Sequence, residues 1–216
     1  METPVTTKID TFFARYRLRT YAKGQVLLLG GENTGTMYHL ATGRVKMYDV
    51  TYRGDEVILN TFKPPAFFPM ALAINGGDSP YIYEAETDVE LHQAPAEEVL
   101  AFVKDNPDVM YDLLSRLYTG VDGLVRRMSL LMGGSARGRL IYEILLEARR
   151  FGEQRTDNGC TLQVSEKSIG TRAGLSRETV SREIHKLKQD KIIEVRGKTV
   201  VVCDMRALER LLGQEL

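Results

Sequence analysis

Residues 165 to 189 read Ser-Glu-Lys-Ser-Ile-Gly-Thr-Arg-Ala-Gly-Leu-Ser-Arg-Glu-Thr-Val-Ser-Arg-Glu-Ile-His-Lys-Leu-Lys-Gln, a pattern that predicts two helices joined by a tight turn. Ser165 and Ser176 are each placed to cap a helix, because a serine oxygen accepts hydrogen bonds from the free N–H groups of a first turn. Gly174 falls where the turn needs a residue that tolerates a positive φ, and Gly170 is small where the helices should cross. The apolar residues that should fix the crossing angle are Ile169, Ala173, Leu175, Val180, Ile184 and Leu187. This is the pattern of a helix-turn-helix.

The second of these helices begins with side chains that suit the edges of DNA bases. An arginine can donate two hydrogen bonds to guanine, and a glutamate can accept one from cytosine. We therefore predict that the second helix reads bases in the major groove through Arg177, Glu178, Ser181 and Arg182. The alternative is an ordinary surface helix, in which Glu178 and Arg182 form an ion pair across one turn.

A hairpin with a basic tip is predicted directly after this helix. Two runs of β-branched residues flank Arg196-Gly197-Lys198, as in two strands joined by a short turn. The hairpin would serve as the wing of a winged helix-turn-helix. Candidate contacts to the DNA backbone are Ser165, Thr171, Ser176, Thr179, Arg196 and Lys198.

The sequence Arg177-Glu-Thr-Val-Ser-Arg182, followed by Gly197-Lys-Thr-Val-Val-Val202, resembles the DNA-binding domain of the cyclic-AMP receptor protein and FNR family of bacterial transcription regulators. The resemblance implies a homodimer that binds double-stranded DNA at an inverted repeat, with half-sites about one helical turn apart. It also implies half-sites close to TGTGA, with a TTGAT-like sequence as second choice. RNA polymerase would be a further partner if the protein activates transcription.

Charge divides the chain into an acidic and a basic part. Residues 134–216 hold 16 Lys and Arg against 12 Asp and Glu, whereas residues 1–133 hold 13 against 17. A basic C-terminal part fits a nucleic-acid module attached to a different domain. The two cysteines, Cys160 and Cys203, lie far apart, and the sequence shows neither a signal-peptide pattern nor a membrane-spanning run. We therefore expect reduced thiols in a cytoplasmic protein with no membrane partner.

The sequence offers no pattern for a metal, a prosthetic group or catalysis. No cysteine precedes Cys160, which excludes the N-terminal iron–sulfur cluster of some members of the family, and no haem ligands are evident. His39, His92 and His185 are isolated and lack metal-ligand spacing. The sequence contains no recognisable pattern for a catalytic nucleophile, a catalytic base or a phosphate-binding loop, so we do not expect an enzyme. The remaining alternative is a ligand-binding regulatory module that docks onto an enzyme or another protein.

Residues 1–133 predict a β-rich sensor domain. A short helix is expected at residues 6–18, and short strands punctuated by glycine turns are expected at 25–29, 36–41, 44–50, 56–62, 81–86 and 88–93. The pattern resembles the β-roll of cyclic-nucleotide-binding domains. The expected fold is therefore α+β, with an N-terminal β-roll and long dimerisation helix in residues 1–133 and a winged helix-turn-helix in residues 134–216. The boundary is expected at Gly133-Gly134.

The long helix, at about residues 107–132, carries an apolar seam with heptad spacing. The seam consists of Met110, Leu114, Leu117, Val121, Leu124, Met128 and Leu131. Such a seam favours a coiled coil with a second copy of the helix. The alternative is a helix that lies on its own β-roll.

The candidate effector pocket departs from the cyclic-AMP members of the family. Those members hold the nucleotide with a Gly-Glu step and an Arg-Ser pair, at which this chain has Pro69-Met70 and Ser79-Pro80. We therefore do not expect a response to cyclic AMP. The residues expected to line the cavity are Phe68, Met70, Tyr81, Tyr83, Leu124, Arg44, Tyr48 and Arg127. Two alternatives stay open: a small aromatic or hydrophobic acid as effector, or a pocket filled by the protein's own side chains.

Overall fold

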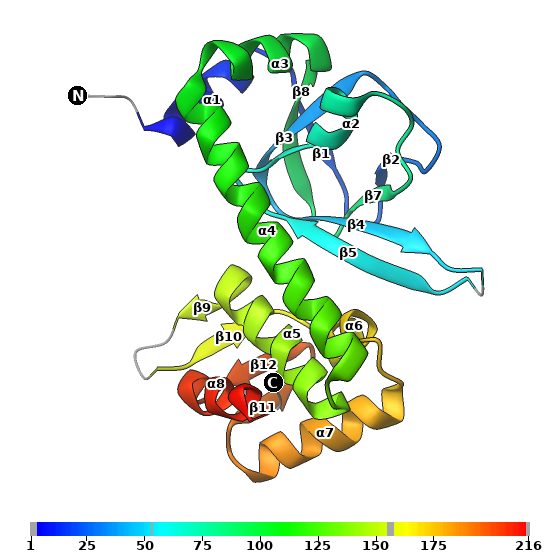
Figure 1. Ribbon diagram of the computed structural model, residues 1–216, viewed down its shortest axis with the longest axis vertical. Helices are drawn as coiled ribbons and strands as arrows, with labels where there is room; N and C mark the ends of the chain where they lie inside the picture. Colours follow the sequence, from blue (N-terminus) through cyan, green and yellow to red (C-terminus); the bar gives the residue numbers. More distant parts are fainter. Residues whose placement is uncertain (1–3, 53, 155–157, 215–216) are drawn as a thin grey trace. The chain divides into compact units, whose positions relative to one another are not determined.

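The computed structural model describes residues 4–52, 54–154 and 158–214 and divides into two compact units between Thr119 and Gly120 (Figure 1). Each unit combines helices with a β-structure, as the α+β prediction requires. The elements of the first unit are α1 (Val5–Phe13), β1 (Leu18–Tyr21), β2 (Val26–Leu28), β3 (Thr36–Thr42), β4 (Val45–Val50), β5 (Glu56–Phe62), β6 (Phe67–Phe68), α2 (Met70–Asn75), β7 (Ile82–Ala85), β8 (Val89–Pro95), α3 (Ala96–Asp105) and the first part of α4 (Pro107–Gly133).

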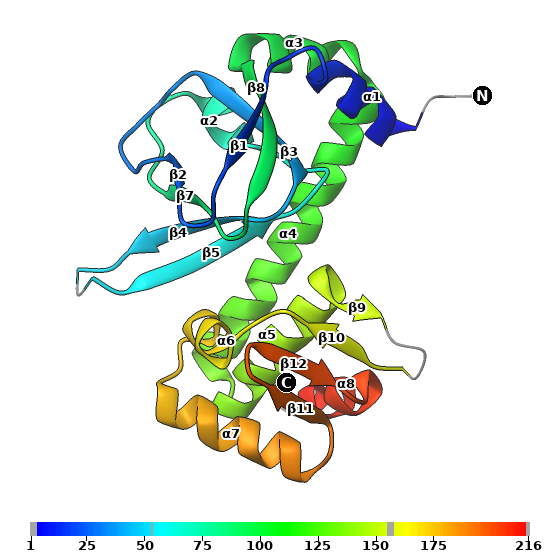
Figure 2. The same ribbon diagram turned by 180° about the vertical axis from the view of Figure 1, so that it is seen from behind.

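The strands of the first unit form two antiparallel four-stranded sheets, with the orders β1-β8-β3-β6 and β2-β7-β4-β5 (Figures 1 and 2). This arrangement confirms the predicted β-roll. The helix expected at residues 6–18 is shorter, because it ends at Phe13 and the chain becomes strand again at Leu18. Strand β1 pairs with β8 from Leu18 to Tyr21, so its backbone hydrogen bonds come from the sheet instead of a helix.

Of the isolated histidines, His39 is buried in the core of the first unit and His92 is half-buried beside it. His39 of β3 and His92 of β8 are cross-strand partners, and Phe13 of α1 stacks on His39 with ring centroids 4.6 Å apart. Burial lowers the pKa of His39 to about 4, so this ring is neutral near neutral pH. No group of three or more potential metal ligands is present in the described ranges.

Helix α4 continues without a break from the first unit into the second. It ends at Gly133, and Ser135 caps the next helix by accepting a hydrogen bond of 3.0 Å from the N–H of Gly138. The compact units nevertheless divide inside α4, earlier than the boundary expected at Gly133-Gly134. Side-chain contacts explain the difference, because the hydroxyl of Tyr142 donates to the carbonyl of Gly123 at 2.8 Å. The second part of α4 is thereby attached to the C-terminal unit.

The second unit is a winged helix-turn-helix. Its further elements are α5 (Ala136–Phe151), β9 (Glu153–Gln154), β10 (Cys160–Leu162), α6 (Glu166–Ala173), α7 (Arg177–Gln189), β11 (Ile193–Arg196), β12 (Thr199–Val202) and α8 (Met205–Gly213). Its sheet has the order β11-β12-β10-β9, and α7 runs along the outer edge of the unit in both views (Figures 1 and 2). Within the described ranges, no helix is long and apolar enough to span a bilayer.

Candidate nucleic-acid interface

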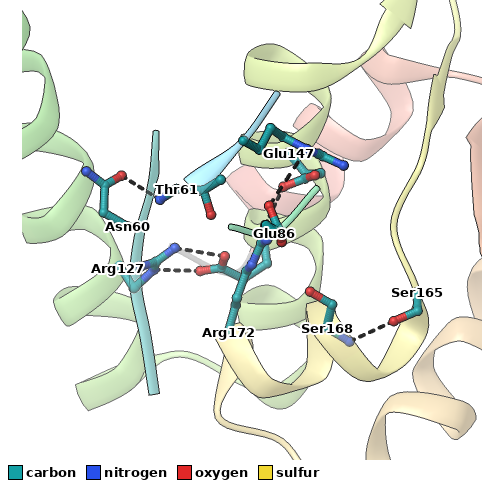
Figure 3. Close-up of polar contacts among 10 residues, drawn as sticks. Asn60, Thr61, Glu86, Arg127, Glu147, Ser165, Ser168 and Arg172 are labelled. Carbon is teal, nitrogen blue, oxygen red and sulfur yellow. Dashed lines mark hydrogen bonds and ion pairs between the residues drawn. The ribbon is translucent and has the colours of Figure 1, made fainter. Parts of the chain in front are cut away.

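The two predicted serine caps fix the start of both helices of the helix-turn-helix. The Ser165 hydroxyl accepts from the N–H of Ser168 at 3.2 Å, as Figure 3 shows, and the Ser176 hydroxyl accepts from the N–H of Thr179 at 3.3 Å. Between them, Gly174 adopts φ +61° and ψ +42°, a left-handed conformation that favours glycine. The turn therefore forms as the sequence predicts.

Gly170 allows α6 and α7 to approach closely. A Cβ atom at this position would lie 2.6 Å from Cγ2 of Val180, which is too short for any real contact. The remaining apolar residues of the predicted crossing are buried, apart from the half-buried Leu175. One face of α7 is therefore buried in the C-terminal unit, and the opposite face is exposed.

The four predicted base-reading residues all lie on the exposed side of α7. Arg177 and Glu178 occupy its first turn, and Ser181 and Arg182 follow one turn later. The pKa of Glu178 lies below its usual range, first because the carboxylate accepts from its own backbone N–H and next because Ser176 donates to it. An ionised carboxylate at the helix start can accept from cytosine, beside guanidinium groups that can donate to guanine.

The ion pair of an ordinary surface helix is not found between Glu178 and Arg182 among the described residues. Arg182 instead lies with its Nε 3.4 Å from Oε1 of Glu183, to which Lys186 also donates at 2.9 Å. Glu183 is buried, and burial acts to raise its pKa, but the bonds from Lys186 and Arg182 outweigh this effect and lower it. Sequence reasoning missed Glu183, although a glutamate among the apolar positions of α7 was the available signal.

Four of the residues predicted to contact the DNA backbone also form local contacts within the protein. Ser165 and Ser176 use their hydroxyl oxygens as caps, and the hydroxyl of Thr171 donates to the carbonyl of Lys167 at 3.0 Å. The Thr179 hydroxyl lies 3.1 Å from that of Ser176. These hydroxyl groups lie at the starts of α6 and α7 or one turn further along.

The wing carries the two predicted cations at its tip. Strands β11 and β12 pair up to Arg196 and Thr199, and Gly197 between them has φ +62°. Nη2 of Arg196 donates to Glu194 at 2.6 Å, so part of its charge is balanced within the wing. Lys198 is exposed and has no ion pair in the part of the chain that the structure describes.

Two largely buried ion pairs hold α5 against its neighbours. Arg127 of α4 donates to both oxygens of Glu143, at 2.7 and 2.9 Å, and Arg172 of α6 pairs with Glu147 (Figure 3). Both glutamates are buried. The sequence signal was a pair of glutamates four residues apart on a helix that is otherwise apolar at these positions. Through these pairs, α5 attaches the helix-turn-helix to the end of α4.

Aromatic side chains fill the interior of the β-roll. The rings of Phe68 and Tyr83 are parallel within 3°, with centroids 5.5 Å apart, and Phe62 stacks on Phe68 at 4.7 Å. Tyr38 approaches Phe68 from another strand at 5.8 Å. Burial raises the pKa of Tyr83 to about 12, so its hydroxyl stays protonated. Sequence reasoning named Phe68 and Tyr83 but missed Phe62 and Tyr38, whose strand neighbours Thr61, Met37 and His39 are also buried, so that no alternation marks them.

The other residues of the candidate pocket have different surroundings. Tyr81 is half-buried beside the aromatic stack, whereas Met70 begins α2 and packs in the separate cluster formed with α1 and α3. The hydroxyl of Tyr48 donates to Glu84 at 3.0 Å, and Arg44 lies 3.7 Å from Glu86.

The last two residues of the candidate pocket belong to the second unit. Leu124 is 51% exposed, and Arg127 is engaged by Glu143. An effector pocket that combines them with residues of the β-roll stays a prediction.

The seam of α4 is exposed along its whole length. Between 44% and 61% of the surface of each seam residue is accessible in the single chain, and the seven are Met110, Leu114, Leu117, Val121, Leu124, Met128 and Leu131. Leu113, by contrast, packs against the first unit. Within the first unit, Met110, Leu114 and Leu117 of the seam are therefore not covered by the β-roll, and the coiled coil stays a prediction.

Comparison with known proteins identifies both halves of the chain. Residues 18–106 match the family model of the cyclic nucleotide-binding domain, and residues 138–211 match that of the Crp-like helix-turn-helix domain. The cAMP-activated global transcriptional regulator CRP of Haemophilus influenzae is 25% identical over 199 residues, which cover 92% of this chain and 89% of that protein. The global nitrogen regulator of a Nostoc species is 27% identical over 189 residues, or 86% of this chain and 84% of that protein.

A solved structure shares the fold. A CRP/FNR-family transcriptional regulator from Thermus thermophilus aligns with a TM-score of 0.74 at 22% identity, covering 93% of this chain and 100% of that one. The cyclic nucleotide-binding match falls on the β-roll, and the helix-turn-helix match falls on the C-terminal unit. Family and fold thus agree, and the chain belongs to the Crp/Fnr family of DNA-binding transcription regulators, which are not enzymes.

Proposed function

We propose that this regulator acts in the cytoplasm as a homodimer, which places one α7 helix in each of two successive major grooves of an inverted repeat. The observation that carries the proposal is the exposed N-terminal half of α7, where Arg177, Glu178, Ser181 and Arg182 share one accessible surface. Two-fold symmetry of the protein requires a two-fold operator with half-sites about one helical turn apart. The similarity of the Arg177-Glu178-Arg182 pattern to the family supports TGTGA-like half-sites, with TTGAT-like as second choice.

Selection of bound duplexes from a random pool tests this proposal. We expect an inverted repeat to be enriched, and we expect a gel-shift titration to show that its affinity falls steeply with salt, because phosphate contacts release counterions. The control is a random duplex of equal length, which should bind more weakly by a factor of about a thousand or more. A protein that binds neither duplex, but co-purifies with an enzyme, would instead support the regulatory-module alternative. Activation of transcription would further require contact with RNA polymerase.

We further propose that cyclic AMP is not the effector, although relatives such as the Haemophilus influenzae protein are named for activation by it. A nucleotide phosphate that leaves water needs a cationic partner with several donors. The hydroxyl of Ser79 is buried and already used, because it donates to the carbonyl of Tyr81 at 2.8 Å and accepts from its N–H at 3.2 Å. Pro80 has no N–H to offer. The stack of Phe68 and Tyr83 moreover occupies space inside the roll.

Calorimetric titration with cyclic AMP and cyclic GMP checks this prediction. Burial of an unpaired charge costs several kcal/mol, and each 1.4 kcal/mol corresponds to about tenfold in affinity, so we expect a Kd in the millimolar range or weaker. Operator binding should be equal with and without either nucleotide. Micromolar binding, together with about a tenfold gain in operator affinity, would contradict the proposal and point to Arg44 or Arg127 as a substitute for the missing phosphate ligand.

A further inference from the structure

His185 lies in the middle of the exposed face of α7, and the proposed set of base-reading residues leaves it out. The buried residues of α7 are Val180, Glu183, Ile184 and Leu187. Since successive residues of a helix are turned by about 100°, the residues opposite that face are Glu178, Arg182, His185 and Gln189. His185 follows Arg182 by three positions and Ser181 by four, so the three side chains are neighbours on one surface.

The nearest charged groups around His185 are Arg182, Lys186 and Lys188, and Lys188 is exposed with no ion pair in the described part of the chain. On α7 itself, Arg182 and Lys186 both bind the buried carboxylate of Glu183. The imidazole of His185 has no hydrogen bond or ion pair in the described ranges of the chain, and the side chain is exposed.

The elements that pack against α7 are α5, α6 and β11. Several of their charged side chains have ion-pair partners, whereas Arg139 of α5 and Glu166 and Lys167 of α6 have none among the described residues. Arg137 of α5 pairs with Asp190, just beyond the end of α7, at 3.1 Å. Arg172 of α6 pairs with Glu147, and Arg196 of β11 pairs with Glu194. None of these pairs includes His185, so its ring is accessible to an external ligand.

We propose that His185 is a further DNA-contacting residue, whose protonated imidazole donates a hydrogen bond to an acceptor of the operator. This inference rests on the proposed function of α7. Both nitrogens of a protonated imidazole are donors, and guanine N7, guanine O6 and phosphate oxygens are acceptors of the right kind. Histidine side chains change charge between about pH 5 and pH 8. DNA that binds the protonated form takes up a proton, so operator affinity rises as pH falls.

The position along the helix supports such a contact. At a rise of about 1.5 Å per residue, His185 lies about 10 Å beyond Glu178 along the helix axis. The major groove is about 12 Å wide, so a helix that presents its first turn to the bases still faces the groove or its phosphate wall two turns later. The acceptor for His185 can be a base or a phosphate of the DNA backbone. A base would make the pH dependence of DNA affinity specific to the operator, whereas a phosphate would give it on any sequence.

The test is fluorescence anisotropy of labelled duplexes with full-length protein at about pH 6, 7 and 8 and constant ionic strength. For the wild-type protein we expect operator affinity to rise about three- to tenfold from pH 8 to pH 6. His185→Gln keeps a polar side chain of similar size without the titrating charge and should remove this dependence. His185→Lys keeps a positive charge at each pH and should bind with pH-independent affinity.

The random duplex is the second arm of the experiment. Equal pH dependence on operator and random DNA assigns the acceptor to phosphate, and pH dependence on the operator alone assigns it to a base. A wild-type protein whose operator affinity does not change with pH, or a Gln variant that keeps the wild-type dependence, would overturn the inference while leaving the proposed function intact. Absence of saturable DNA binding at every pH would instead remove the proposed function, and this inference with it.

Discussion

Gly170 and Gly174 are required in the helix-turn-helix for different physical reasons. Gly174 has a positive φ, which is a property of the backbone, whereas Gly170 has an ordinary helical conformation and is limited by its neighbour. The space for a Cβ at Gly170 is occupied by Val180, which is β-branched, nearly fully buried and unable to move its Cγ2 away at low cost. The close crossing of α6 and α7 therefore depends on a single missing methyl group.

Gly170→Ala should destabilise the protein even though alanine favours helices. The gain in helix propensity is about 0.5 to 1 kcal/mol, whereas overpacking in a filled core costs about 1 to 3 kcal/mol. We expect a net loss in the free energy of unfolding, measured by denaturant titration. The control is Gly123→Ala in α4, whose Cβ would meet only the Tyr142 hydroxyl at 3.8 Å, and which should be stabilising. If both variants are equally stable, the crossing is looser than the 2.6 Å contact indicates.

Arg177→Ala should reduce operator affinity and relax base preference at one G·C pair. Loss of a bidentate contact to guanine costs about 1 to 3 kcal/mol, and most of that loss disappears on random DNA. Lys198→Ala is the matched control, because a phosphate contact from the exposed wing tip weakens all sequences alike and lowers the salt dependence by about one ion. Equal losses on operator and random DNA for Arg177→Ala would show that this side chain does not read a base.

The residues of the interface were predictable to different degrees. Ser165, Ser176 and Gly174 follow from rules that involve only a few neighbouring positions, and the structure places all three as those rules require. Glu183 stands among the apolar positions of α7, but its burial could not be assigned from this signal alone, because burial depends on how α7 packs against other elements. His185 was noticed only as a residue without metal-ligand spacing, since exposure on a particular face requires the position of the neighbouring helices.

At the level of elements, long periodic segments were predictable and short ones were not. Helix α4 and strands β3, β4 and β5 lie within one or two residues of their expected bounds. Strand β6 and helix α2 were missed, because two paired residues and six helical residues carry too little periodic signal. Helix α1 was expected to extend past Phe13, since the aromatic spacing continues to Tyr16. Pairing of β1 with β8 outweighed that local preference.

Contacts between α4 and α5 place the second part of α4 in the C-terminal unit. Arg127 binds Glu143 with two hydrogen bonds, and α4 is further attached through Gly123 and the buried Leu130. The glutamates of α5 are a signal in the sequence, but the partners in these contacts could not be predicted, because each contact joins residues of two helices whose relative packing the sequence does not give. The end of α4 is therefore part of the second, DNA-binding unit, although the helix begins in the first unit.

Glu143→Gln should loosen this attachment and destabilise the C-terminal unit. Removal of one partner from a buried pair leaves the other charge uncompensated. Burial raises the pKa of Glu143, although the charges of Arg127 and Arg172 oppose this effect. The cost of burying the ionised carboxylate therefore offsets part of the stabilisation that the short hydrogen bonds provide. We therefore expect a loss of about 1 to 3 kcal/mol in the free energy of unfolding.

Asp122→Asn provides the control for the Glu143 variant. Asp122 pairs with Arg126 at 3.3 Å on the same helix, but both side chains are more than 60% exposed. Removal of such a surface pair should cost at most about 0.5 kcal/mol. Chemical denaturation followed by circular dichroism measures both variants. Equal effects of the two substitutions would show that the buried pair does not hold α4 to α5.

At the scale of the whole molecule, the seam of α4 is an apolar surface that stays exposed in a single chain. Seven apolar residues at heptad spacing are each close to half-exposed over about six turns of helix. Exposed apolar surface of this extent is typical of an interaction site. A second copy of α4 would bury the seam and would give the protein the two-fold symmetry that an inverted-repeat operator requires.

The double variant Leu117→Glu with Leu124→Glu should therefore yield monomers that fold but bind the operator weakly. Two carboxylates in the core of a coiled coil face both desolvation and repulsion from the partner's carboxylates, whereas in a monomer they remain in water, since these positions are 61% and 51% exposed. Circular dichroism should be unchanged, and sedimentation should report one chain in place of two.

The matched control for the seam variant is Ser115→Glu with Ser129→Glu, which adds the same charge to exposed positions of the same helix, beside the seam rather than on it. This variant should remain dimeric and bind the operator with wild-type affinity, because neither carboxylate leaves water on association.

An intact dimer with normal operator binding in the Leu117→Glu, Leu124→Glu variant would show that the two chains associate through a different surface. A folded monomeric wild-type protein that still binds an inverted repeat would contradict a dimer that forms before DNA binding. The two helix-turn-helix units would then have to be brought together by the DNA alone, and binding would depend on protein concentration to the second power.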